Sequence, residues 1–232
     1  MNILILDTAT EREIIVIKTP TGVFASSDNS SAHAASLFNR VQTLLTEADV
    51  TLSEINALAV GIGPGSFTGI RIAVASARMI AQINRVPIVG IKTHELFAAS
   101  LCESDVPQIA EGALIMPAFD AKKNRIFAAL YRARAGEYKE ILEPGDYTPE
   151  YILRLCGNEK IIAGGSGADK YQEIFAKNNN CTLLPKLPVN KEAIAALAER
   201  QLSQHRPHDY GSVLPFYARK SDAEIAKEKS GK

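Results

Sequence analysis

The feature that most constrains this sequence is an apolar segment that ends in aspartate and occurs twice. Residues 3–6 are Ile, Leu, Ile and Leu, and Asp7 follows them directly. A second apolar segment, residues 113–119, runs into Asp120 in the same way. A continuous apolar run is typical of a strand that is buried on both faces of a sheet. The pattern therefore predicts two buried strands in equivalent places of a duplicated fold.

The segments after each of these strands are expected to form a similar series of strands and helices. Alternation, apolar periodicity and turn residues predict the elements. Expected strands cover residues 14–17, 23–27, 57–62, 87–91, 125–132, 137–142 and 160–163. Expected helices cover the residues after Ser30 and Ser31 to Ala48, then 66–84, 93–101 with Thr93 as a cap, 148–156, 169–178 and 191–204. Two successive βββαβα units predict a duplicated α/β fold with a cleft between its halves, where such sheets bind ligands.

The same pattern suggests how the chain divides. A loop around Pro107 separates the two series of elements. We therefore expect an N-terminal domain over residues 1–103 and a smaller C-terminal domain over residues 113–218. Residues 219–232 are rich in both charge signs and are expected to form a polar, solvated tail.

Composition narrows the class of function. Lys plus Arg number 26 and Asp plus Glu number 26, so the formal net charge is zero. A protein that grips nucleic acid alone usually carries a basic excess, so any RNA contact is expected to be shared with a partner. The 3 cysteines form no CxxC pair, which favours reduced thiols. With neither a signal-peptide pattern nor a long apolar run, the expected location is cytoplasmic, away from any membrane.

The strongest local motif is the glycine-rich segment of residues 61–71, Gly-Ile-Gly-Pro-Gly-Ser-Phe-Thr-Gly-Ile-Arg. It follows an expected strand and opens an expected helix, where free backbone N–H groups favour an anion. It matches neither the Walker A loop nor the Rossmann fingerprint. Two explanations stay open at this point: a loop that binds phosphate, or a tight turn that caps the helix through Ser66.

Two motifs together give a specific resemblance. Residues 7–10, Asp-Thr-Ala-Thr, and residues 63–71 resemble the TsaB (YeaZ) family, and the resemblance extends over nearly the whole chain. It implies a fold like that of actin and Hsp70, which is ribonuclease H-like. It also implies a role beside TsaD, a catalytic paralogue, and TsaE, an ATPase. That assembly transfers threonylcarbamoyl from threonylcarbamoyl-AMP to adenosine N6 next to the tRNA anticodon.

In this family the TsaB subunit resembles a scaffold rather than a catalyst. The resemblance thus implies no catalytic residue, no metal and no cofactor in this chain, and tRNA contact only through the complex. By analogy with nucleotide-binding members of the fold, a first set of residues is expected to face a nucleotide or phosphate. These candidates are Asp7, Thr8, Gly63, Gly65, Ser66, Thr68, Gly69 and Asp120. The plainer alternative is that Asp7 and Asp120 end strands and cap turns.

Two enzymatic alternatives remain. The first is an ATPase or kinase of the actin-like fold, with the glycine cluster of residues 164–167 as an adenosine-binding loop. The second is a metallopeptidase. Against it, the catalytic paralogue is expected to hold metal through two histidines four residues apart. In this chain the residue four positions after His33 is Leu37. One histidine does not supply the three or more ligands that a metal needs.

The helix after the glycine-rich segment is apolar on nearly all sides. A helix on one face of a sheet needs one apolar stripe, so the remainder needs cover from a subunit or from the chain itself. The resemblance implies that this helix and the preceding one pair with TsaD or with a second copy of this chain. The expected interface residues are Phe38, Val41, Ile70, Arg71, Val74, Ala77, Arg78 and Ala81.

This chain departs from several relatives within that helix. Ala73, Ala75 and Met79 stand where those relatives carry glycine, and Arg78 is unusual beside them. These departures put the geometry of the interface in doubt. We predict that a charge at Val74 or Ala81 weakens association without unfolding the monomer.

Overall fold

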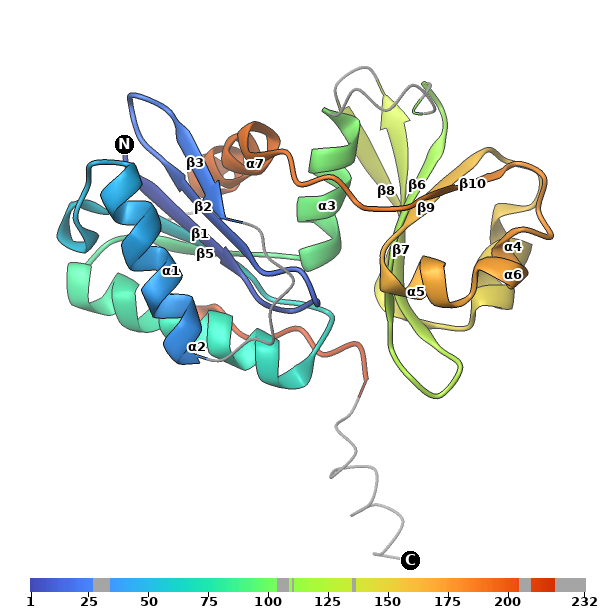
Figure 1. Cartoon of the computed structure of the whole chain (residues 1–232), viewed down its shortest axis with the longest axis horizontal. Helices are drawn as coiled ribbons and strands as arrows, with labels where there is room; N and C mark the ends of the chain where they lie inside the picture. The colour runs from blue at the N-terminus through green and yellow to red at the C-terminus, as the bar shows by residue number, and fades with distance from the viewer. Residues whose placement is uncertain (27–33, 104–108, 110, 135–136, 205–209, 220–232) are drawn as a thin grey trace, which may run out of the picture.

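The computed structural model describes residues 1–26, 34–103, 109, 111–134, 137–204 and 210–219. The chain forms two lobes, each built around a five-stranded sheet (Figure 1). Within the described residues, no helix is long and apolar enough to cross a membrane. The predicted helix caps Ser30 and Ser31, and also His33, lie outside the described residues.

The sheet of the first lobe has the strand order β3-β2-β1-β4-β5. Strands β1, β2 and β3 form an antiparallel meander, while β4 and β5 extend the sheet parallel to β1. The bounds are β1 Ile3–Asp7, β2 Ile14–Lys18, β3 Val23–Ser26, β4 Ala57–Gly61 and β5 Ile88–Ile91.

The sheet of the second lobe repeats this arrangement with the order β8-β7-β6-β9-β10. Strands β6, β7 and β8 are antiparallel, and β9 and β10 add on parallel to β6. The bounds are β6 Leu114–Asp120, β7 Ile126–Arg134, β8 Glu137–Tyr147, β9 Ile161–Gly164 and β10 Cys181–Leu184. The fold class is therefore confirmed as a duplicated, actin-like α/β fold, with Asp7 and Asp120 at the ends of equivalent central strands.

Helices form three layers around the two sheets. Helices α1 and α2 cover one face of the first sheet, α3 and α7 lie between the two sheets, and α4 to α6 cover the far face of the second sheet (Figure 1). The bounds are α1 Ala34–Glu47, α2 Phe67–Asn84, α3 Thr93–Cys102, α4 Pro149–Cys156, α5 Ser166–Lys170, α6 Gln172–Phe175 and α7 Lys191–Gln204, with short 3-10 helices η1 Leu52–Glu54 and η2 Tyr210–Ser212.

This layering explains why the first strand is apolar at every position. Ile3 and Ile5 pack into the core between the two sheets, and Leu4 and Leu6 pack into the core beneath α1 and α2. All four side chains are fully buried. Each contributes about 1.5–3 kcal/mol relative to an exposed side chain. A strand with two covered faces cannot alternate between polar and apolar residues.

Three details differ from the predictions. The expected helix over 169–178 is two shorter helices, α5 and α6, of which α5 begins at Ser166. Strand β10 was not predicted, because residues 181–184 form a short run without flanking strand signals. Thr93 does not cap α3: it is the first helical residue, and Lys92 precedes it.

The last long helix does not follow the predicted domain ranges. Helix α7 belongs to the range 113–218 by sequence, yet it packs on the sheet of the first lobe. It contacts all five strands of that sheet, mainly β2, β3 and β5, and β1 and β4 more weakly. The chain thus returns to the first lobe before it ends. The division at residues 103 and 113 itself stays a prediction.

Candidate functional site

The central strand of the first lobe ends in a fully buried carboxylate. The Oδ1 atom of Asp7 accepts a hydrogen bond from the backbone N–H of Ala9 at 2.6 Å, and Oδ2 accepts one from the hydroxyl of Thr93 at 2.7 Å. The Thr93 hydroxyl in turn accepts the backbone N–H of Gly63 at 3.1 Å. Burial raises the pKa of Asp7 to about 6, against the opposing effect of the hydrogen bonds from Thr93 and Ala9.

The contact of Asp7 with a ligand stays a prediction. Both carboxylate oxygens are occupied by groups of the chain, and none of the side chain is exposed. Thr93, which the sequence suggested as a helix cap, is instead the residue that links the strand end to the glycine-rich loop. Asp7 joins β1, α3 and the loop.

The glycines of the loop are required by close packing against residues 8 and 9. A Cβ atom at Gly65 would lie 2.1 Å from the carbonyl oxygen of Ala9, and one at Gly69 would lie 1.9 Å from that of Thr8. The Ser66 N–H donates to the Ala9 oxygen at 2.6 Å. The Thr8 hydroxyl donates to the Gly69 oxygen at 2.7 Å. The loop is therefore closed on the segment that follows β1.

The structure contains the helix cap that one of the two explanations for this loop requires. The Ser66 hydroxyl accepts the backbone N–H of Gly69 at 3.3 Å, at the start of α2. Thr8, Gly63 and Gly69 are buried, and their contact with a phosphate stays a prediction. Ser66 and Thr68 are exposed and Gly65 is half-buried, and for these three a phosphate contact stays a prediction.

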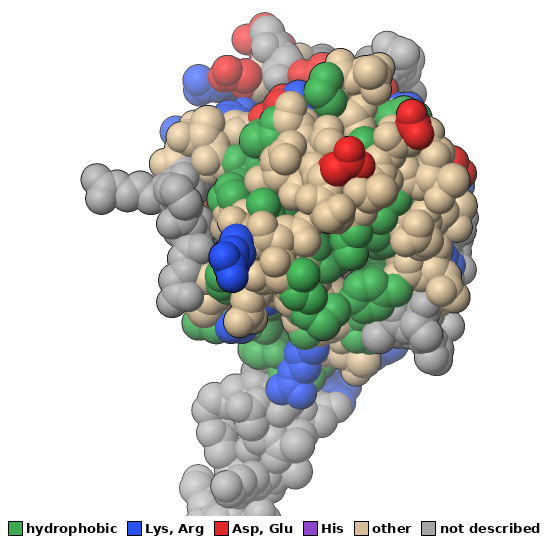
Figure 2. All heavy atoms as spheres, turned by 90° about the vertical axis from the view of Figure 1, so that its left-hand side faces the viewer, with side chains coloured by type: hydrophobic (Ala, Val, Ile, Leu, Met, Phe, Trp, Pro, Cys, Tyr) green, Lys and Arg blue, Asp and Glu red, His purple; other side chains and the backbone are tan. Residues whose placement is uncertain are grey.

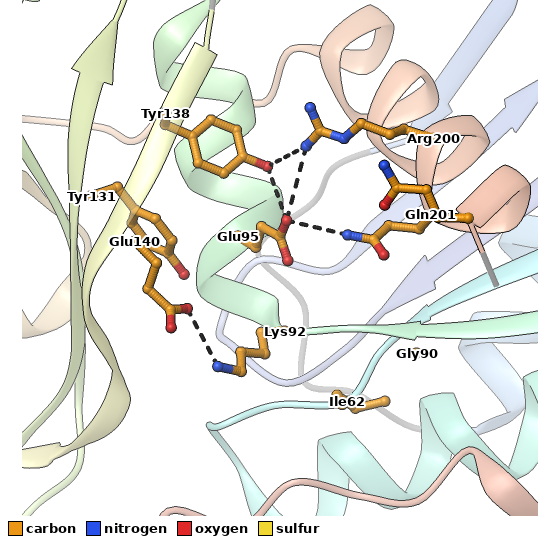
Figure 3. Close-up of a pocket in the computed structure, with 10 residues that line it drawn as sticks. Ile62, Gly90, Lys92, Glu95, Tyr131, Tyr138, Glu140, Arg200 and Gln201 are labelled. Atoms are coloured by element: carbon orange, nitrogen blue, oxygen red, sulfur yellow. Dashed lines mark hydrogen bonds and ion pairs between the residues drawn. The ribbon is translucent and has the colours of Figure 1, made fainter.

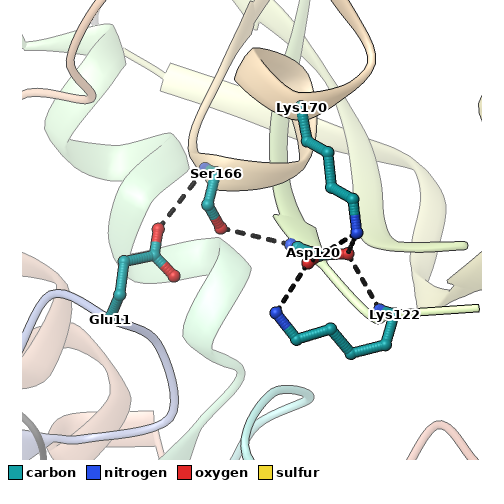
Figure 4. A network of polar contacts seen from close by, with 5 residues as sticks. All are labelled: Glu11, Asp120, Lys122, Ser166 and Lys170. Atoms are coloured by element: carbon teal, nitrogen blue, oxygen red, sulfur yellow. Dashed lines mark hydrogen bonds and ion pairs between the residues drawn. The ribbon is translucent and has the colours of Figure 1, made fainter.

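The equivalent strand end in the second lobe is more open and carries an ion-pair cluster (Figure 4). The Asp120 carboxylate accepts hydrogen bonds from Lys170 Nζ at 3.0 Å and from Lys122 Nζ at 2.8 Å. Partial burial acts to raise the pKa of Asp120, but these hydrogen bonds outweigh burial and hold the pKa below its ordinary value. A nucleotide contact for Asp120 stays a prediction.

The chain bridges the two strand ends with its own groups. The backbone N–H of Ser166 donates to the Glu11 carboxylate at 3.3 Å, and the Ser166 hydroxyl accepts the Asp120 N–H at 3.2 Å (Figure 4). The Arg12 guanidinium donates to the carbonyl oxygen of Leu187. Glu11 and Arg12 belong to the turn after β1, so the hairpin of the first lobe is bonded directly to the second lobe.

The predicted partner surface is partly buried. Several of its members are buried within the single chain, so they contribute to the core beneath α1 and α2 rather than to a free surface. Helix α2 is covered on one side by the sheet and on another by η2, with Val213 and Tyr210 packed against the same core. The buried members are Val41, Ile70, Val74, Ala77 and Ala81, each at most 3% exposed.

The exposed face of α2 carries a different apolar stripe. Ala75, Met79 and Ile83 follow one another at intervals of four residues and are exposed, Met79 at 47% and Ile83 at 72%. This spacing places them on one side of the helix. Figure 2, which views the left-hand side of Figure 1, shows hydrophobic side chains gathered over that side of the molecule. Of the predicted surface, Phe38 and Arg78 are half-buried and Arg71 is exposed.

A segment near the C-terminus fixes the start of this face. The ring of Tyr217 stacks on that of Phe67 with centroids 4.3 Å apart. Arg71 Nε donates to the Tyr217 hydroxyl at 3.0 Å and its guanidinium lies 4.0 Å from the centre of the Phe67 ring. Sequence reasoning missed Tyr217 as part of this face, because the spacing of 146 residues from Arg71 has no local signal.

Within the described residues, no three His, Cys, Asp or Glu side chains are grouped so that they could hold a metal ion. His94 is fully buried and its Nε2 lies 3.0 Å from the carbonyl oxygen of Phe127. Burial lowers the pKa of His94 to about 4.

Comparison with known proteins extends this description. A family model described as TsaD, tRNA N6-adenosine threonylcarbamoyltransferase, matches residues 5–227. The tRNA threonylcarbamoyladenosine biosynthesis protein TsaB of Escherichia coli is 33% identical over 172 residues, which cover 71% of this chain and 72% of that protein. TsaB of Haemophilus influenzae is 25% identical over 191 residues, with 77% of each protein covered.

Two solved structures share the fold. An uncharacterized protein of Pseudomonas aeruginosa, described as similar to peptidase YEAZ, superposes with a TM-score of 0.78 at 25% identity, covering 94% of this chain and 99% of that one. YeaZ of the same organism gives 0.77 at 24% identity, covering 93% and 100%.

Fold and strand ends together define a two-lobed, actin-like α/β protein in which the first strand end is closed by the chain itself. The matches place it more narrowly. The chain belongs to the family that the TsaD model describes and, by its likeness to the curated relatives, to the TsaB (YeaZ) proteins.

Proposed function

We propose that this chain takes part in the biosynthesis of threonylcarbamoyladenosine in tRNA as a non-catalytic partner subunit. In this proposal TsaD supplies the reactive centre and TsaE the ATPase activity, and this chain contacts tRNA only within their complex. When TsaD is absent, a second copy of the chain can bind the same surface.

The closed strand end of the first lobe carries the proposal. A catalytic or nucleotide-binding carboxylate needs a free oxygen at the site where the ligand lies. Asp7 accepts hydrogen bonds at both oxygens and is fully buried. The bridges from Glu11 and Arg12 to the second lobe also place chain groups between the two strand ends. These observations favour a structural use of the strand ends over an enzymatic one.

The outer face of α2 supports the choice of partner surface. Exposed apolar side chains of this size are more typical of an interface than of a solvated helix. Met79 and Ile83 are therefore the residues that we assign to the contact with TsaD, with Ala75 allowing close approach between helices. This assignment replaces the buried residues Val74 and Ala81.

The association itself can be measured by calorimetric titration of this chain with TsaD. Met79→Glu and Ile83→Glu place a charge on the exposed stripe, and each is expected to weaken binding by at least about tenfold, because a charge buried at an interface without a partner is costly. Circular dichroism is expected to show an unchanged fold in both variants.

Val74→Glu is the contrasting variant. Val74 is 3% exposed in the core beneath α2, so a charge there is expected to unfold the chain rather than to affect binding alone. Ser53→Glu, on the exposed turn η1, is a matched control that leaves binding unchanged. Binding to TsaD that is unaffected by Met79→Glu and Ile83→Glu would place the partner elsewhere.

A further inference from the structure

A cavity lies between the lobes, lined by residues of both. Its volume is about 640 Å³, which falls within the usual range for sites of small molecules. Figure 3 shows side chains that converge on it from β7 and β8 on one side and from α3 and α7 on the other. None of the residues predicted to face a nucleotide lines it. Its polar lining includes Lys92, Glu95, Tyr131, Tyr138, Glu140 and Arg200.

The hydroxyl of Tyr131 is the most informative group in this cavity. Tyr131 is 1% exposed, and its hydroxyl has no hydrogen-bond partner among the described residues. A buried hydroxyl left without a partner is unfavourable, because it has lost its hydrogen bonds to water. Its ring is held edge-on against Tyr138, with centroids 5.6 Å apart. In Figure 3 the Tyr131 hydroxyl points into the cavity beside Glu140, where a ligand atom could satisfy it.

The charges around the cavity are of both signs and are loosely paired. Lys92 Nζ lies 3.3 Å from the Glu140 carboxylate, and the Arg200 guanidinium lies 4.0 Å from the Glu95 carboxylate. Glu95 also accepts hydrogen bonds from the Tyr138 hydroxyl at 3.1 Å and from Gln201 at 3.4 Å. Glu140 accepts only from Lys92 among the bonds described for its side chain.

This arrangement selects the charge of a ligand. A purely anionic molecule would meet Glu95 and Glu140, and a purely cationic one would meet Lys92 and Arg200, each at a cost. A zwitterion can place its carboxylate beside the cations and its ammonium beside Glu140. The cavity is large enough to admit a molecule of amino-acid or dipeptide size.

We propose that this interlobe cavity binds a small zwitterion carrying an ammonium and a carboxylate, a free amino acid or a dipeptide, with Tyr131 and Glu140 among its contacts. The proposal is independent of the role proposed for α2, because the cavity is built by α3, α7, β7 and β8.

The test uses the full chain alone, without TsaD. Each proteinogenic L-amino acid and the dipeptide alanylalanine is added at millimolar concentration, and binding is followed by thermal shift and by NMR chemical-shift changes. N-acetylalanine, which keeps only the carboxylate, and alanine methyl ester, which keeps only the ammonium, serve as single-charge probes. At least one zwitterion is expected to bind saturably, and both single-charge probes are expected to fail.

Two variants locate the binding. Tyr131→Phe removes only the unpartnered hydroxyl, so the fold is expected to be as stable as before while affinity falls about tenfold. Glu140→Gln is expected to weaken binding by a similar factor. Tyr151→Phe, on the exposed surface of α4, is the matched control and leaves affinity unchanged. The proposal is overturned if no zwitterion binds, if the single-charge probes bind equally well, or if both cavity variants bind like the unchanged protein.

Discussion

The two strand ends of this duplicated fold have the same position and opposite surroundings. Asp7 ends β1 in a buried joint with neutral donors from Thr93 and Ala9. Asp120 ends β6 beside the cations of Lys122 and Lys170. Each carboxylate is at the end of the central strand of a sheet with the same order.

The difference shows that the topology of the sheet fixes where each aspartate lies. The neighbouring residues determine whether its carboxylate is buried or available for contacts. In the first lobe the glycine-rich loop packs against residues 8 and 9, which covers the carboxylate. In the second lobe the segment after β9 is also glycine-rich, but it leaves Asp120 partly open and adds Lys170 from α5. A buried joint stabilises the fold, whereas an open ion pair contributes little stability and remains available for contacts.

The largest effect expected from this comparison comes from the glycines. Gly69→Ala would place Cβ 1.9 Å from the Thr8 oxygen, and we expect a loss of about 3 kcal/mol or more in the free energy of unfolding. Gly167→Ala, in the second lobe, would place Cβ 2.8 Å from backbone atoms of Phe119, and the expected loss is about 1–2 kcal/mol. Urea denaturation of each variant measures both values.

Gly22→Ala is the control for this pair. Its Cβ would meet the Phe24 ring at 3.7 Å, an ordinary contact, so the change is expected to stay within about 0.5 kcal/mol. Equal losses for Gly69→Ala and Gly167→Ala would mean that the two loops are packed alike.

The next effect concerns pH. Because the folded pKa of Asp7 is raised to about 6, the folded chain binds a proton more readily than the unfolded chain between about pH 4 and pH 6. The contribution of Asp7 to stability therefore falls as pH rises through that window, by about 3 kcal/mol. Asn does not titrate, so the Asp7→Asn variant lacks this loss. As pH rises from about 4 to 6, the free energy of unfolding of the variant should therefore increase relative to that of the unchanged protein.

Asp120 is expected to behave in the opposite sense. Its pKa is lowered in the folded chain, so its contribution is present above its ordinary pKa and is lost as pH falls through the folded value. Asp120→Asn should accordingly reduce stability at neutral pH and have less effect in acid. Denaturation curves recorded from pH 3 to pH 7 separate the two slopes, and slopes of the same sign would contradict the comparison.

The smallest effects come from the partners of the two carboxylates. Thr93→Val leaves Asp7 Oδ2 and the Gly63 N–H without their shared hydroxyl, and the expected loss is about 2 kcal/mol. Lys170→Ala removes one exposed partner of Asp120 while Lys122 remains, so the expected loss is much smaller than that of Thr93→Val. Thermal melts rank the two, and a larger loss for Lys170→Ala would reverse the assignment.

Much of this fold could be predicted from the sequence because its central strands are buried on both faces. Continuous apolar runs ending at Asp7 and Asp120 indicate such strands, and helical periodicity over residues 191–204 gave a helix with those bounds. Periodicity describes which residues share a side of a helix, but it does not say which sheet the helix covers. The return of α7 to the first sheet therefore required the structure.

The same limit applies at the candidate site. Val74 and Ala81 belong to an apolar helix, and the sequence could not show that η2 and Val213 cover one of its sides. Asp7 carries the residue type that a ligand site needs, but its hydrogen-bond donor Thr93 lies 86 residues away. The glycine spacing left a capping turn and a phosphate-binding loop open, and the contact that packs this turn, with Ala9, is too distant in sequence to leave a local signal.

The most direct test of the central claim is reconstitution of tRNA modification from purified proteins. Threonylcarbamoyladenosine is measured by mass spectrometry after incubation of tRNA and threonylcarbamoyl-AMP with TsaD and TsaE, with and without this chain. We expect modification to require TsaD, to increase when this chain is added, and to be absent with this chain alone. Modified tRNA produced by this chain without TsaD would contradict the account.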